Sequence, residues 1–92
     1  AIVTLMGASP NPFNPQTTLR FDLHHAASTH LAIYDLRGRL VRSLVDEELS
    51  PGAHETTWNG RDDTGAEVAS GTYVARIDAG AQRVSTCLTL IK

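Results

Sequence analysis

A proline-rich segment placed directly before a β-strand pattern is the feature that most constrains the fold of this chain. Residues 10–15 read Pro-Asn-Pro-Phe-Asn-Pro. Each proline fixes its φ angle and removes a backbone donor, and the residue before each proline is pushed away from helical geometry. Behind this segment, Leu19, Phe21 and Leu23 alternate with charged residues, which is the two-residue period of a half-buried strand. The pattern predicts a stiff, extended entry into a first strand at residues 17–23.

The rest of the chain carries turn signals at intervals that are typical of an all-β sandwich. We expect further strands at residues 29–36, 40–45, 54–58, 72–79 and 82–91. Residues 24–28 are predicted to form a turn, 46–52 an acidic loop, and 59–70 a long polar loop from which Val68 reaches the core. A helix over residues 36–49 is the alternative, but this segment has no convincing cap or stop signal.

Length and charge limit the classes of protein to which the chain can belong. Its 92 residues suffice for one domain with one thin core, and its formal net charge of −2 offers no basic field for nucleic acid. No apolar run approaches the roughly 18 residues of a membrane span. Because the chain does not begin with Met, we expect a piece of a longer protein. Residues 1–8 are then a linker or an edge strand from a preceding domain, and residues 9–92 form the domain itself.

The triplet Asp63-Thr64-Gly65 also occurs in aspartic proteases, whose chemistry needs two carboxylates that share a proton. Here it follows a polar run that ends in Asp62, which would add a further charge to such a site. The alternative is a loop turn, in which aspartate side chains bind nearby backbone N–H groups and the glycine adopts a left-handed conformation. The sequence favours the turn, and we predict no enzymatic activity and no catalytic residue.

No metal or cofactor site is predicted. The side chains of Asp62, Asp63, Thr64 and Glu67 could bind Ca²⁺, but their spacing lacks the ligand order of known calcium loops. The histidines show no metal-ligand spacing; they are His24, His25, His30 and His54. The single cysteine, Cys87, permits no internal disulfide, and its position in an apolar strand pattern predicts a buried, inert thiol.

The few aromatic residues are expected to fill the core. An exposed Trp58 paired with a tyrosine would suit sugar binding, but in a small sandwich such residues more often pack inside. The run Gly71-Thr72-Tyr73 is similar to the tyrosine corner of immunoglobulin-like (Ig-like) folds, in which the phenol binds back to the backbone. Phe13 is expected to plug the end of the sandwich.

Five segments, in order, carry a family resemblance. They are the proline segment with its strand (10–23), I-Y-D-x-x-G-R-x-V (33–41), L-x-x-G-x-H (49–54), W-N-G-x-D-x-x-G (58–65) and S-G-x-Y (70–73). The set resembles the type IX secretion (Por secretion) C-terminal sorting domains of secreted bacterial proteins. These are similar to the Ig-like domain of the flagellar hook-capping protein. The resemblance covers about residues 9 to 92 and implies an Ig-like antiparallel β-sandwich of about seven strands.

The resemblance also implies a non-catalytic sorting and attachment signal for outer-membrane secretion. In that family the recognised surface includes the C-terminal strand and its final basic residue, here Leu88, Thr89, Leu90, Ile91 and Lys92. A last strand at a sheet edge would offer unpaired backbone groups for strand addition. A structural role is assigned to the remaining motif residues: Pro10, Asn11, Pro12, Phe13, Asn14, Pro15, Trp58, Gly60, Gly71 and Tyr73.

The expected partners are the secretion apparatus or a neighbouring domain of the same chain, without nucleic acid or membrane insertion. An exposed edge strand could pair two copies. The expected location is the periplasm, and then the medium or the cell surface of a Gram-negative-type bacterium. Two alternatives remain open: an Ig-like structural spacer or flagellar hook-cap-type assembly module, and a carbohydrate-binding accessory module.

Overall fold

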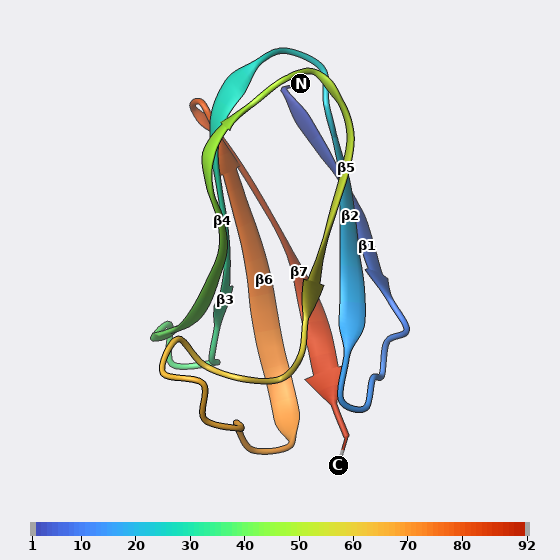
Figure 1. Ribbon diagram of the computed structural model, residues 1–92, viewed down its shortest axis with the longest axis vertical. Helices are drawn as coiled ribbons and strands as arrows, with labels where there is room; N and C mark the ends of the chain where they lie inside the picture. Colours follow the sequence, from blue (N-terminus) through green and yellow to red (C-terminus); the bar gives the residue numbers. More distant parts are fainter. Residues whose placement is uncertain (1, 92) are drawn as a thin grey trace.

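Two antiparallel sheets face each other in the computed structural model, which describes residues 2–91 (Figure 1). Strands β1, β2 and β5 form a three-stranded sheet in the order β1-β2-β5, and the other sheet has the order β4-β3-β6-β7. The bounds are β1 (Val3–Ser9), β2 (Thr17–Leu23), β3 (Ala27–Tyr34), β4 (Leu40–Leu49), β5 (Gly52–Trp58), β6 (Gly71–Ala79) and β7 (Gln82–Leu90). The predicted Ig-like antiparallel β-sandwich of about seven strands is confirmed.

Alternation along the strands places the core between the two sheets. In β2, Leu19, Phe21 and Leu23 are buried, while the residues between them are more exposed. In β6, Ala75 and Ile77 are fully buried on the opposite wall, as the two-residue period requires. Burying each large apolar side chain contributes about 1.5–3 kcal/mol, so a core of this kind stabilises a domain without disulfides.

The helical alternative for residues 36–49 is wrong, because Leu40–Leu49 form β4. This strand is also longer than predicted. The acidic residues 46–48, expected in a loop, continue the pairing with β3 through His30↔Asp46, and an edge strand tolerates such charges. Strand β3 lies two residues earlier than expected at both ends and finishes before Asp35. No helix in residues 2–91 meets the length and hydropathy required to cross a membrane.

Residues 3–9, for which the sequence left open a linker or an edge strand, form β1, which pairs with β2. The expected boundary between residues 8 and 9 therefore falls inside a strand of the sandwich. The side chain of Gln82 at the start of β7 binds the backbone of Ile2 and Val3. Strand β1 thus begins at one end of the long axis, whereas β7 runs to the opposite end (Figure 1).

Candidate functional site

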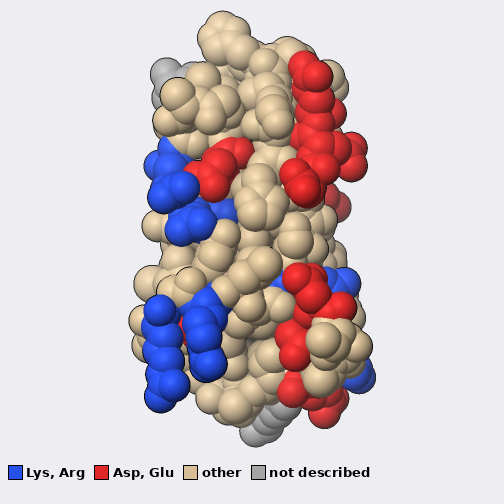
Figure 2. Space-filling model, turned by 90° about the vertical axis from the view of Figure 1, so that its left-hand side faces the viewer, with Lys and Arg blue, Asp and Glu red and all other residues tan. Residues whose placement is uncertain are grey.

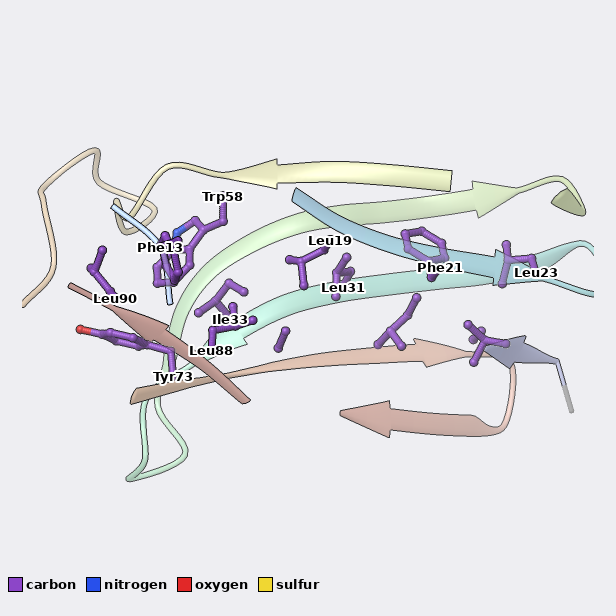
Figure 3. Packing of buried hydrophobic residues seen from close by; sticks show 14 of the residues in the cluster. Phe13, Leu19, Phe21, Leu23, Leu31, Ile33, Trp58, Tyr73, Leu88 and Leu90 are labelled. Atoms are coloured by element: carbon purple, nitrogen blue, oxygen red, sulfur yellow. The ribbon is translucent and has the colours of Figure 1, made fainter. Parts of the chain in front are cut away.

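Three aromatic rings close the end of the sandwich at which β7 finishes (Figure 3). Trp58, the last residue of β5, is 0% exposed, and its ring centroid lies 5.5 Å from that of Phe13 and 5.3 Å from that of Tyr73. The Phe13 ring is tilted by 56° and the Tyr73 ring by 73° relative to the indole, which are favourable edge-type contacts. Trp58 is therefore a core residue and not an exposed platform for sugars.

The polar atoms of two rings bind the loop that joins β5 to β6. The indole N–H of Trp58 donates to the carbonyl of Arg61 at 2.9 Å, near the start of this loop. The hydroxyl of Tyr73 donates to the carbonyl of Ala69 at 2.6 Å, near its end, in the manner of a tyrosine corner. Burial raises the pKa of Tyr73 above its ordinary value. Both ends of the loop are thereby fixed to the aromatic core, and Val68 packs against it as predicted.

The proline segment runs along the outer edge of β7. The backbone N–H of Phe13 donates to the carbonyl of Thr89 at 2.9 Å, and the N–H of Ile91 donates to the carbonyl of Phe13 at 2.9 Å. The side chain of Asn11 adds two more bonds, donating to the carbonyl of Cys87 at 3.2 Å and accepting from the N–H of Thr89 at 3.0 Å. Residues 11–13 therefore act as a short additional strand beside the end of β7.

This arrangement corrects the expectation that the end of β7 offers unpaired backbone groups. Four outward-facing backbone groups already bind residues 11–13: the carbonyls of Cys87 and Thr89 and the N–H groups of Thr89 and Ile91. Within the recognition segment predicted from the sequence, Leu88 and Leu90 are buried and Ile91 is 50% exposed. Lys92 lies outside the described residues. Within residues 88–91, the side chain of Thr89 is half-buried and that of Ile91 is exposed, so this segment offers outer side chains and not a free sheet edge.

The remaining motif residues lie at the same end of the sandwich, and only some of them make contacts there. The carbonyl of Pro10 accepts from the Thr17 hydroxyl at 2.7 Å, whereas Pro12 and Asn14 are exposed. The carbonyl of Pro15 faces Gly60 in the loop after β5. Gly71, at the start of β6, is exposed. The family motif assigned Asn11 a structural role, but no local pattern predicted that its side chain would bind the backbone of β7.

Gly60 marks a close approach between the β5–β6 loop and the proline segment. Its φ is +75°, and a Cβ there would lie 3.2 Å from the Pro15 carbonyl oxygen. Gly60→Ala is therefore expected to destabilise the domain by about 1–3 kcal/mol, through left-handed strain and this contact. Gly38→Ala is the matched control, because its φ is +84° but nothing lies within 4 Å. Equal losses in urea unfolding of the two variants would show that the contact with Pro15 contributes nothing.

The acidic loop uses its carboxylates within the protein. Asp62 Oδ1 accepts from the Thr64 hydroxyl at 2.6 Å and from the N–H groups of Thr64 and Ala66. Asp63 Oδ1 accepts from the N–H of Ser43 at 3.0 Å, and Glu67 pairs with an arginine. The triplet that begins at Asp63 is thus a loop turn. Within residues 2–91, no three His, Cys, Asp or Glu side chains are grouped to hold a metal.

Protonation of Asp62 should loosen this loop. The Thr64 hydroxyl and the neighbouring N–H groups lower the pKa of Asp62 below its ordinary value. Because the pKa is lower in the folded state, this stabilisation is fully present above about pH 4 and is lost as the pH falls through the folded-state value. We expect the amide resonances of Thr64 and Ala66 to shift with the Asp62 carboxyl in an NMR titration. If they kept their positions in Asp62→Asn at neutral pH, the charge would not be what holds the loop.

Cys87 corrects another expectation, because it is exposed. In β7, Leu88 and Leu90 point into the core, so their neighbour Cys87 points outward. The apolar character of the strand suggested burial, whereas the two-residue period decides against it.

A family model for the FlgD Ig-like domain matches residues 9–83. This chain belongs to the FlgD Ig-like domain family. No curated protein matches the chain in sequence. Among solved structures, dimeric latent PorU from Porphyromonas gingivalis is similar, with a TM-score of 0.77 and 19% identity over 97% of this chain and 9% of PorU.

Two further structures of similar fold are PorZ and FlgD. PorZ, described as an essential surface component of the type IX secretion system of P. gingivalis, has a TM-score of 0.64 and 24% identity over 94% of this chain and 11% of PorZ. FlgD from P. aeruginosa has a TM-score of 0.63 and 20% identity over 80% of this chain and 59% of FlgD. At these identities the similarity shows the fold alone. The chain spans only a small part of PorU and PorZ and somewhat over half of FlgD.

Proposed function

We propose that this FlgD Ig-like domain is a non-catalytic sorting and attachment signal at the C-terminal end of a larger secreted protein. The observation that carries the proposal is the construction of one end of the sandwich. Residues 11–13 hold the end of β7 in place beside a buried aromatic cluster, so that its last residues form a fixed shape. This end lies opposite the start of β1, and is therefore directed away from any domain that precedes the chain (Figure 1).

The proposed partner is the outer-membrane secretion apparatus, reached through the periplasm of a Gram-negative-type bacterium. The similarity to PorZ, a surface component of the type IX system, supports this choice. Nucleic acid is not proposed as a partner. In Figure 2, acidic groups gather mainly along one edge of the visible face and basic groups along the opposite edge. Uncharged atoms separate the basic groups, so this face has no continuous basic surface.

An Ig-like spacer or hook-cap-type assembly module is the second candidate. The start of β1 and the end of β7 lie at opposite ends of a body 37 Å long, which suits a module placed in line between two others. The similarity to FlgD supports it equally. A spacer needs the shape of the domain but not the side chains of Ile91 and Lys92, which follow β7 in the sequence, and this difference can be tested.

A secretion assay separates the two candidates. Residues 1–92 are fused behind a reporter enzyme that carries a signal peptide, in a bacterium with a type IX apparatus. For a sorting signal, we expect the reporter at the cell surface or in the medium, and in the periplasm when Ile91→Asp and Lys92→Glu are combined. Leu36→Asp, at another exposed apolar position (70% exposed), is the matched control and should leave export intact. A folded domain that retains the unaltered fusion in the periplasm would favour the spacer.

A further inference from the structure

The four outer edges of the two sheets are protected to different degrees, and the difference points to a binding surface. The end of β7 is covered by residues 11–13. Strand β1 contains a register shift between Leu5 and Gly7, the kind of bulge that prevents edge pairing. Strand β4 is covered at one end, where the N–H of Asp63 donates to the carbonyl of Val41, and carries three consecutive acidic residues, 46–48, at the other.

Strand β5 has none of these protections. Its pairing with β2 is continuous from Gly52 to Trp58, without a bulge, and it contains no proline. Within residues 2–91, no segment forms backbone hydrogen bonds along its outer side. The strand carries one charged side chain, Glu55, which already pairs with Arg20 at 3.2 Å. It is an open edge of the kind to which an extended peptide can add a strand.

Alternation of the ladder identifies the free backbone groups on β5. The N–H of His24 donates to the carbonyl of Ile2. Because this direction alternates along a strand, the backbone N–H and C=O groups of the even-numbered residues of β2 point toward β1, and those of the odd-numbered residues point toward β5. Their even-numbered partners on β5 complete that ladder. The N–H and C=O groups of Ala53, Glu55 and Thr57 therefore point outward, and offer three adjacent sites for an added strand.

A hollow beside this edge suggests which side chains an added strand would carry. It has a volume of about 400 Å³ and lies over β2 and β5, lined by Arg20, Phe21, Asp22, Ala53, His54 and Glu55. Its two carboxylates outnumber the single guanidinium. Asp22 has no ion-pair partner within residues 2–91. The small side chain of Ala53 leaves room for the aliphatic part of a lysine or arginine whose charge reaches Asp22.

We propose that β5 binds an extended segment of another protein that carries basic residues at alternate positions. The backbone of the segment pairs with Ala53, Glu55 and Thr57, and one basic side chain enters the hollow toward Asp22. A second copy of this chain fits less well. If the β5 strands of two copies paired antiparallel with Glu55 at the centre, the two Glu55 carboxylates would lie opposite each other. If the register shifted by two residues, each Glu55 would lie opposite Ala53 or Thr57, neither of which is a cation. This inference does not depend on the sorting role.

The test uses a soluble heptapeptide of alternating lysine and valine as the probe. Amide hydrogen exchange, followed by NMR, should slow at least about tenfold at Ala53, Glu55 and Thr57 when the peptide saturates the domain. The same peptide with N-methyl groups on alternate backbone nitrogens, along the edge that would pair with β5, should not bind, because it lacks the N–H donors for the β5 carbonyls. A glutamate–valine peptide should bind at least about tenfold more weakly.

Variants assign the binding to this edge. Asp22→Asn should weaken binding of the lysine peptide about two- to fivefold, the range of an exposed ion pair, while Asp46→Asn on β4 should leave it unchanged. Thr57→Pro removes an outward N–H and should abolish binding, with circular dichroism to verify the fold. The proposal is overturned if protection appears at β4 or nowhere, if the N-methylated peptide binds equally well, or if the domain dimerises through β5 without peptide.

Discussion

Trp58→Ala is expected to remove about 3–5 kcal/mol from the free energy of unfolding, which is the usual cost of truncating a buried tryptophan. The indole is fully buried, contacts the rings of Phe13 and Tyr73, and donates to the carbonyl of Arg61. A domain of this size has a total stability of about 5–10 kcal/mol, so the variant should lose about half of it. Thermal unfolding should shift down by about 15–30 °C.

Trp58→Phe separates the ring from its polar atom. Phenylalanine keeps an aromatic side chain against Phe13 and Tyr73 but cannot donate to Arg61, so it should cost about 1–3 kcal/mol, less than alanine. Urea unfolding with tryptophan-independent detection, such as far-ultraviolet circular dichroism, measures both variants. If Trp58→Ala lost less than about 1 kcal/mol, the aromatic cluster would not be what holds the two sheets together at this end.

The parts of the fold that the sequence predicted are those governed by short-range periodicity. Residues 17–23 alternate without interruption, and β2 has the predicted bounds. The inward residues Tyr73, Ala75 and Ile77 of β6 also follow from the two-residue period. Each aromatic residue of the end cluster was recognised from its own motif. Their meeting at one end could not be read from any of these motifs alone.

The features that the sequence did not predict depend on contacts between distant segments. Asn11 and Thr89 are 78 residues apart, so no local pattern shows that the proline segment covers β7. The acidic residues 46–48 were predicted to form a loop because of their charge. Their pairing with β3 is a contact between segments that the local sequence does not show. At Cys87, apolar character was given more weight than strand parity. The open edge at β5 could not be predicted either, because it depends on which distant segments bind the outer sides of β4 and β7.

Phe13→Ala is expected to release the proline segment from β7 and to cost about 3 kcal/mol, the lower end for a buried phenylalanine. The ring is 2% exposed, but it is carried by a segment that can collapse or detach, and such sites recover part of the loss. The N–H of Ile91 donates to the carbonyl of Phe13. When the segment detaches, hydrogen exchange at the N–H of Ile91 and at the N–H of Thr89 should therefore become faster.

Asn11→Ala is the informative control, because it removes two hydrogen bonds without opening a cavity. It should cost about 1–2 kcal/mol and speed exchange at Thr89, whose N–H binds the Asn11 side chain, while Ile91 stays protected by Phe13. Loss of protection at both amides in Phe13→Ala, and at one in Asn11→Ala, would show that the aromatic plug anchors the segment. Protection of both amides in Phe13→Ala would mean that the backbone bonds of residues 11–13 hold β7 without the ring.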